Sequence, residues 1–298
     1  MRIVNPLYDV AFKYLMENND LARKIIGLIL EEEIEELSVG QQETSYTDEK
    51  RFMTLYRLDF KAVIKQPDGT RQKVLIELQK SKSDTEIQRF RTYLGLNYLK
   101  PETEKQPDGK EAKVSYPIIT IYILGYSIAD IPYVAVTINN CATNSVNRQP
   151  IELRSDFVRM LTHRSHILQV GRLPEERRTR LEQFLSFFNQ AWKTEEGFIL
   201  DMKEVPEEFK ELAHYLSIPL MDEAFQNRLR AEEEIDARFD QQEAKYLQQI
   251  EEAKRKEEEA VKSLAVLVRK MHAKGFSVRE IAEDLGKATE EIEKLLRA

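Results

Sequence analysis

Two apolar segments separated by a proline–glycine turn constrain the fold of this sequence most. Residues 56–64 and 73–79 alternate in the manner of β-strands, and Gln66-Pro67-Asp68-Gly69 lies between them. Proline fixes φ at a value that a turn requires, and glycine accepts the positive φ that other residues avoid. The pattern predicts a β-hairpin, so the chain has to fold around a sheet that contains these two antiparallel strands.

Helical and apolar segments flank this hairpin on both sides. The expected elements are, in chain order, helices from residues 5 and 20, an edge strand over 34–39, the hairpin, a helix over 84–99, strands over 118–124, 133–138 and 167–170, and a helix over 174–192. The run at 118–124 is apolar throughout, which is typical of a strand buried on both faces. This order predicts an α/β fold in which helices pack against a mixed sheet.

The composition changes after Pro219. Residues 222–259 contain neither proline nor glycine, and Glu, Gln, Lys, Arg and Ala dominate them, which favours one long exposed helix. A heptad frame passes through the aromatic and alanine positions Phe225, Phe239, Tyr246 and Ala253, but acidic residues interrupt it. Two interpretations stay open: a weak coiled coil that joins two copies as a homodimer, and a solvated stalk with Glu–Lys pairs.

The C-terminal stretch predicts three short helices. Gly275 and Gly286 suit helix ends, and Ser277 with Glu280 has the spacing of a capping box. The arrangement resembles a helix-turn-helix, but the third helix is acidic and would be repelled by phosphates. We favour a helical cap or a protein-binding unit. The predicted organisation is a domain over residues 1–220, a long helix over 221–262 and a small helical module over 263–298.

Charge and cysteine content limit the classes of protein that this chain can belong to. The net charge of -7 excludes a generally basic nucleic-acid binder, so any DNA contact requires a local basic surface. The single cysteine, Cys141, excludes an internal disulfide framework and is expected to be an incidental thiol. The first residues lack a signal-peptide pattern, and the longest apolar run falls well below the roughly 20 residues of a membrane span. We expect a cytoplasmic protein without a membrane partner.

Acidic side chains interrupt the apolar hairpin. Side chains alternate across a strand, so Asp59 and Lys61 share one face, and Glu77 and Gln79 share a face of the next strand. An acid that follows an apolar run needs a partner or a metal, because burial of an unpaired charge is costly. Two carboxylates on neighbouring strands can hold Mg²⁺ or Mn²⁺. The sequence predicts a metal site at Asp59 and Glu77; a purely structural pair is the alternative.

The order Asp59, hairpin, Glu77-Leu78-Gln79 resembles the active site of PD-(D/E)XK nucleases in its E-x-Q form. The flanking residues resemble the recombination-promoting nuclease (Rpn) family, also called PD-(D/E)XK family transposases. The flanking residues that carry the resemblance are Asn5-Pro6, Asp9, Phe12, Lys13, Leu58, Phe60, Ile76, Arg89 and Tyr93, with Gly275-Phe276-Ser277, Glu280-Ile281-Ala282 and Glu290-Glu291-Ile292 in the tail.

The resemblance implies a restriction-endonuclease-like fold and a Mg²⁺-dependent DNA endonuclease associated with mobile elements and recombination, with Mn²⁺ as an alternative metal. Asp59 and Glu77 would bind the metal, and the Leu78 carbonyl would add a ligand. Gln79 takes the place of a lysine that positions the attacking water and offsets negative charge. Lys80 faces the other side of the strand, so the missing charge would come from Lys61 or Lys13.

The same resemblance assigns DNA contacts to Arg89, Arg91 and Tyr93 on the helix after the hairpin, and a supporting role to Asp9. Each has a simpler interpretation. Asp9 and Lys13 have the spacing of a surface ion pair, and Arg89 and Tyr93 suit a solvated helix face.

The sequence also contains a histidine pair with possible metal-ligand spacing and leaves functions other than a nuclease open. His163 and His166 have no evident third ligand and are expected to be polar loop residues. Two alternatives to an enzyme stay open. One is a catalytically weak or inactive nuclease relative that binds DNA or protein, and the other is an oligomer built on the helical stalk.

Overall fold

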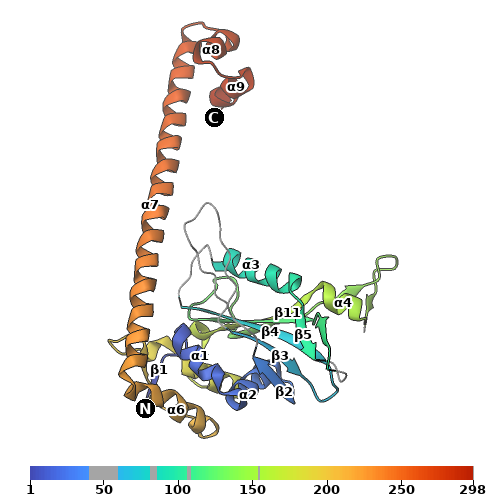
Figure 1. Ribbon diagram of the computed structural model, residues 1–298. Helices are drawn as coiled ribbons and strands as arrows, with labels where there is room; N and C mark the ends of the chain where they lie inside the picture. Colours follow the sequence, from blue (N-terminus) through green and yellow to red (C-terminus); the bar gives the residue numbers. More distant parts are fainter. Residues whose placement is uncertain (40–59, 81–85, 106–108, 154, 298) are drawn as a thin grey trace. The chain divides into compact units, whose positions relative to one another are not determined.

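The computed structural model describes residues 1–39, 60–80, 86–105, 109–153 and 155–297. A six-stranded mixed sheet forms the centre of the N-terminal part (Figure 1). Its strands are, in spatial order, β2 (Glu36–Val39), β3 (Phe60–Lys65), β4 (Arg71–Gln79), β7 (Ile118–Leu124), β11 (His163–Gln169) and β8 (Ala135–Ile138). Strands β4, β7 and β11 are parallel to one another, and the other pairings are antiparallel. The expected mixed α/β architecture is confirmed.

The predicted hairpin is the β3–β4 pair. Phe60 pairs with Ile76 at one end of the described ladder, and Lys65 pairs with Arg71 at the turn. Gly69 has a φ of +83° and its N–H donates to the carbonyl of Gln66 at 2.9 Å. Glycine is therefore required at this turn, because a side chain would be strained at that φ. Residues 56–59 of the expected first strand lie outside the described residues.

Helices cover the two faces of the sheet. α1 (Asp9–Glu17) and α2 (Asn19–Leu30) pack on one face, and α3 (Glu86–Leu99) packs on the other (Figure 1). The larger core lies on the first face, where its sheet residues are Phe60, Ala62, Ile64, Val74, Ile76, Leu78, Ile119, Ile121 and Ile123. The second face holds a smaller core of Leu75 and Ile118 with Phe90 and Tyr93 of α3. Strand β7 is thus buried on both faces, as its apolar sequence predicts.

The first residues form a strand before any helix begins. β1 (Arg2–Val4) pairs with β12 (Ile199–Asp201), and Asn5 directly after it is fully buried. Asn5 Nδ2 donates to Gln190 Oε1 at 3.0 Å and to the carbonyl of Gly197 at 3.2 Å. The helix expected from residue 5 therefore begins only at Asp9, because the residues before it are committed to contacts near residue 197.

The helix expected over residues 174–192 is wrong. A shorter α5 (Arg180–Leu185) is followed by the 3-10 helices η2 (Ser186–Phe188) and η3 (Gln190–Trp192). Thr179 and Glu182 form a capping box that fixes where α5 begins. Asn189 separates η2 from η3. Its side chain accepts a hydrogen bond from the N–H of Ala191 at 3.1 Å, which starts a new turn.

The strand expected at residues 167–170 begins earlier than predicted. β11 starts at His163 because its parallel register with β7 begins at the pair His163 and Ile118. The polar residues at its start hide this length in the sequence. The edge strand β8 is shorter than expected and begins at Ala135.

The remaining elements of this part of the chain are short. Two small hairpins form from β5 (Glu102–Lys105) with β6 (Glu111–Val114) and from β9 (Ala142–Thr143) with β10 (Pro150–Ile151). Residues 106–108, in the second expected turn, lie outside the described residues. The short helices are α4 (Asp156–Leu161), η1 (Val170–Arg172), η4 (Glu207–Phe209), α6 (Lys210–Ser217) and η5 (Ile218–Met221).

The long helix α7 (Glu223–Ala273) belongs to both of the compact units into which the chain divides. It has 51 residues without interruption, as the lack of proline and glycine predicts. The units are Met1–Glu233 and Glu234–Ala298. Phe225 and Leu229 lie in the core of the first unit, with 4% and 0% exposure. The first unit therefore extends past the boundary expected at residue 220, because α7 supplies two of its core side chains.

The second unit consists of the end of α7 with α8 (Val278–Leu285) and α9 (Thr289–Arg297). Ser277 and Glu280 form the predicted capping box at the start of α8, and Gly286 ends the helix with a φ of +61°. The core of the unit contains Val268, Ile281 and Ile292, one from each helix.

The heptad positions of α7 have different surroundings at its two ends. Phe225 and Leu229, a position offset by four from the heptad frame, are buried in the first unit, and Leu264, also offset by four from it, packs against the core of the second. The side chains of Phe239 and Tyr246 lie outside the described residues. A homodimer through this helix stays a prediction, restricted to the middle of α7. Within the described ranges, no helix is both long enough and apolar enough to cross a membrane.

Candidate active site

Residue alternation places Glu77 and Gln79 on the face of the sheet that α3 covers. They share this face with Leu75, which lies in the α3 core, whereas Val74, Ile76 and Leu78 face α1 and α2. On β3, Phe60, Ala62 and Ile64 are buried in the larger core and Lys61 lies on the opposite face. We predict that Asp59 lies opposite Glu77, in the cross-strand pair that follows Phe60 and Ile76. Asp59 lies outside the described residues, so its place beside Glu77 stays a prediction.

Glu77 is fully buried near the carboxyl end of β4. Its partner in the parallel register is Tyr122 of β7. Burial, and after it the negative charge of Glu77, raise the pKa of the Tyr122 hydroxyl. Because Glu77 is buried, water screens its charge only weakly. An electrostatic contact with its carboxylate is therefore stronger than the same contact in water.

Gln79 is anchored by its side chain and by its backbone. Tyr126 donates its hydroxyl hydrogen to Gln79 Oε1 at 2.7 Å. The N–H of Gly125, directly after β7, donates to the Gln79 carbonyl at 2.8 Å. Oε1 accepts from Tyr126, so this contact fixes the orientation of the amide and leaves its nitrogen as a neutral hydrogen-bond donor for a reaction.

Lys61 forms an ion pair with Glu102 of β5, which it shares with Lys73. Both lysine Nζ atoms lie 2.8 Å from Glu102 Oε1. Burial alone would raise the pKa of Glu102, but the contacts with Lys61 and Lys73 outweigh it and the pKa is lowered. Lys73 is 1% exposed and also donates to the carbonyls of Asn97 and Lys100, at 3.2 and 3.1 Å. Lys61 is therefore paired with Glu102, which is not one of the predicted catalytic residues.

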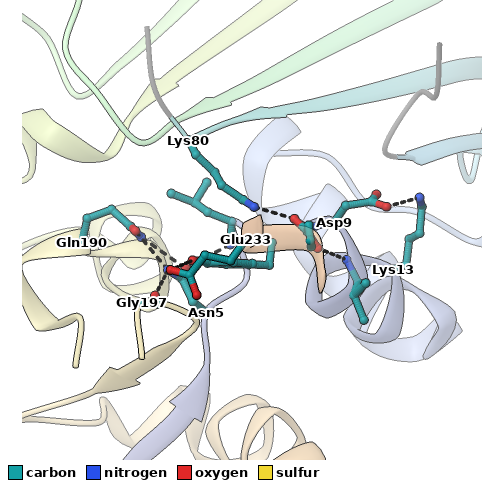
Figure 2. Close-up of polar contacts among 11 residues, drawn as sticks. Asn5, Asp9, Lys13, Lys80, Gln190, Gly197 and Glu233 are labelled. Atoms are coloured by element: carbon teal, nitrogen blue, oxygen red, sulfur yellow. Dashed lines mark hydrogen bonds and ion pairs between the residues drawn. The ribbon is translucent and has the colours of Figure 1, made fainter. Parts of the chain in front are cut away.

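Asp9 and Lys13 form the ion pair that their spacing predicts, with 2.5 Å between Asp9 Oδ2 and Lys13 Nζ (Figure 2). The N-terminus of α1 is also bound from α7. Glu232 accepts hydrogen bonds from the backbone N–H groups of Asp9 and Val10, at 2.8 and 3.1 Å. A carboxylate at this position is favoured by the positive end of the helix dipole. Lys13 is consequently paired within its own helix.

Lys80, directly after Gln79, reaches the other side of the sheet edge, as alternation predicts. Its Nζ lies 2.5 Å from Glu232 Oε1 and 3.6 Å from the centroid of the Tyr8 ring. Figure 2 shows Lys80 extending from the end of its strand toward the N-terminus of α1. Lys80 therefore ties the end of β4 to α1 and α7.

The three residues expected to contact DNA from α3 do not share one environment. The side chain of Arg89 lies outside the described residues, and Arg91 is exposed. Tyr93 is 1% exposed and packs with Leu75 and Phe90. The expectation that Tyr93 contacts DNA is corrected, because its ring forms part of the core between α3 and the sheet.

His163 and His166 lie on strand β11 and not in a loop. His163 Nδ1 is 3.0 Å from the hydroxyl of Tyr98, and His166 Nδ1 is 3.2 Å from Thr137 Oγ1. Residues three apart on a strand face opposite sides, so the two imidazoles cannot share a metal. In the described part of the chain, no group of three or more His, Cys, Asp or Glu side chains is arranged to hold a metal ion.

Stability should fall in mild acid because of His166. Burial, and after it the charge of Arg164, lower the pKa of His166 from 6.5 to about 4. Below pH 6.5 the unfolded chain binds a proton that the folded chain accepts only near pH 4. The free energy of unfolding should therefore decrease over this window, by about 1.4 kcal/mol for each pH unit. Urea unfolding at pH 7 and 4.5 measures this decrease.

A His166→Gln variant provides the control for this pH dependence. Glutamine cannot titrate, so the stability of wild type relative to the variant should drop by about 2 kcal/mol between the two pH values. A difference between the two proteins that stays constant with pH would contradict the low pKa of His166.

Sequence reasoning missed Lys73, Glu102, Tyr126 and Glu232. Lys73 directly precedes the apolar run of β4, which is a signal that a lysine there needs an acid. Tyr126 follows Gly125 at the end of a buried strand, where polar residues commonly reach a site. Glu102 and Glu232 lie in charged segments, and the sequence around them gives no sign of their partners.

Comparisons with protein-family models, with curated proteins and with solved structures found no match.

Proposed function

We propose that this protein is a metal-dependent DNA endonuclease of the PD-(D/E)XK type, with Asp59, Glu77 and Gln79 as its catalytic residues. The observation that carries the proposal is the buried carboxylate of Glu77 two residues before an anchored Gln79, on the second strand of a hairpin. A carboxylate is seldom buried at an apolar position for stability alone, because desolvation opposes it. The link to mobile elements and recombination rests on the family resemblance.

The surrounding architecture supports this proposal. Strand β4 pairs antiparallel with β3 and parallel with β7, and helices cover both faces of the mixed sheet. A mixed sheet with helices on both faces supports the restriction-endonuclease-like fold that we propose from the resemblance. The carboxyl ends of parallel strands are also where α/β proteins usually bind ligands, and Gln79 ends β4 there.

The residues at the end of β4 suit a hard divalent cation. The Glu77 carboxylate is an oxygen donor of the type that Mg²⁺ and Mn²⁺ prefer. We expect Asp59 to supply the second carboxylate and the Leu78 carbonyl a further oxygen. When bound, the cation would lower the pKa of a water molecule and offset negative charge on the phosphate. Gln79 would orient the water by donation from its amide nitrogen.

One set of contacts favours the second candidate function, a nuclease relative that binds DNA with little or no cleavage. Lys13, Lys61 and Lys80 are each paired with an acid, so none is committed to a substrate phosphate. Gln79 is neutral. Charge neutralisation would therefore depend mainly on the metal, and the reaction would be slow.

Incubation of supercoiled plasmid with the protein and Mg²⁺, Mn²⁺ or EDTA tests the proposal. We expect weak, non-specific nicking that is faster with Mn²⁺ than with Mg²⁺ and stops in EDTA. The dependence on metal identity should be steep because two acids without a neighbouring free lysine leave the charge to the metal. Retarded migration of DNA without relaxation, at any metal concentration, would reject the nuclease and support the binding protein.

A further inference from the structure

A pocket of about 320 Å³ lies at the carboxyl ends of the parallel strands β7 and β11. Gly125 follows β7, and Val170 and Gly171 follow β11, so these residues form one side of it. Arg177 and Asn189, from the segments around α5, also line it. Its volume is at the lower end of the range for small-ligand sites, and this edge of a parallel sheet is a usual place for them.

The pocket adjoins the strand that carries Glu77 and Gln79. The N–H of Gly125 donates to the Gln79 carbonyl at 2.8 Å. A Cβ atom added at Gly125 would lie 2.8 Å from the Lys80 carbonyl oxygen and 2.8 Å from Leu7 Cδ1. Only glycine allows this close approach, so the wall of the pocket and the end of β4 are packed directly on each other.

Arg177 supplies the positive charge of this pocket. Its guanidinium carbon lies 4.9 Å from the centroid of the Trp192 ring, and Nη1 donates to the Glu175 carbonyl at 3.2 Å. Nε is buried, and among the described residues neither an acceptor for Nε nor an acid paired with Arg177 is present. A buried N–H donor without an acceptor is costly unless a ligand supplies one.

We propose that Arg177 binds a phosphate of the DNA strand in this pocket, at the edge of the sheet where β4 ends; the inference rests on the proposed nuclease function. A guanidinium can direct two N–H groups at one phosphate, and stacking on Trp192 holds its plane in place. Asn189 adds an amide to the same wall. Glu175 also lines the pocket and opposes an anion there. The pocket thus brings a cation without an acidic partner among the described residues to the edge of the sheet where β4 ends and where Lys80 is already paired with Glu232.

Binding of a fluorescently labelled DNA duplex, measured by anisotropy with Ca²⁺ in place of Mg²⁺, tests this assignment without cleavage. The Arg177→Ala variant should bind about tenfold more weakly, because it loses a charge-assisted hydrogen bond. The slope of log affinity against log salt should decrease by about 1, as expected when one phosphate contact is lost. Arg178→Ala is the matched control, since Arg178 is exposed and paired with Glu176 at 2.7 Å. It should bind like wild type.

Two further variants keep the test decisive if Arg177→Ala does not fold. Arg177→Lys retains the charge without the planar group and should fall between wild type and alanine. Glu175→Gln removes the opposing acid and should tighten binding. Equal affinity and equal salt slope for the folded Arg177 and Arg178 variants would overturn the assignment. So would binding of inorganic phosphate in the pocket without any effect of Arg177 on DNA.

The outcome of this assay is separate from that of the nuclease proposal. Loss of DNA binding in Arg177→Ala, together with no metal-dependent nicking by wild type, would reject the nuclease and support the phosphate site. Normal nicking by Arg177→Ala at unchanged affinity would support the nuclease and reject the phosphate site.

Discussion

Replacing Glu77 by alanine should abolish metal-dependent nicking of plasmid DNA. The variant loses a buried carboxylate that we expect to bind the metal, and the methyl group of alanine offers no oxygen ligand in its place. The measurement is plasmid relaxation against enzyme concentration, with Mn²⁺ to give the largest wild-type signal. If Glu77→Ala nicks as fast as wild type, the cleavage comes from another site or another protein.

Two companion variants separate the loss of a ligand from a loss of structure. Glu77→Gln keeps the size of the side chain and removes its charge, so it should also be inactive while retaining the wild-type circular dichroism spectrum. Gln79→Ala should lose less activity, on the order of 10²-fold, since one neutral contact to the reacting groups is removed. Equal residual activity in the Glu77 and Gln79 variants would contradict the separate roles proposed for them.

A chain that ends at Pro219 should be far less stable than one that ends at Glu233. The shorter chain loses Phe225 and Leu229 from the core and the Glu232 carboxylate from the N-terminus of α1. Burial of two such side chains contributes roughly 3–6 kcal/mol, and a helix cap about 1 kcal/mol. That total is comparable with the whole stability of many domains. Urea unfolding of the two purified fragments measures the difference.

A pair of point variants tests the same conclusion in the full chain. Leu229→Ala should lower the free energy of unfolding of the first unit by about 2–5 kcal/mol, because Leu229 is fully buried. Ile235→Ala lies further along the same helix at a position that is 52% exposed, and it should change stability by less than about 0.5 kcal/mol. A loss as small for Leu229→Ala as for Ile235→Ala would place the end of the first unit before Leu229.

Patterns with a short period predicted the centre of the fold well. The turn at Gly69, the alternation along β3 and β4 and the apolar run of β7 are local properties, and each leads to one backbone conformation. The face shared by Glu77 and Gln79 followed from the same alternation. The placement of Asp59 beside them stays a prediction.

Features that depend on contacts distant in the sequence could not be predicted in this way. The sequence around Lys61 gives no sign that the lysine pairs with Glu102, because Glu102 lies beyond α3 in the chain. Tyr93 has the sequence position of a surface residue, but the direction of α3 turns its ring into the core. The heptad pattern of α7 suggested one interface, whereas Phe225 and Leu264 serve two different cores. Apolar spacing shows that a face is buried but does not show which surface buries it.

The contacts of β1, Asn5 and α1 also determine when the fold can be completed during synthesis. β1 needs β12 as its partner, Asn5 needs Gln190, and the first turn of α1 needs Glu232. The ribosome therefore has to release most of the first unit before its earliest segments acquire their native neighbours. Closing such long loops is entropically costly and slows folding. The emerging chain should depend on chaperones for longer than a domain of equal size whose early helices pack locally.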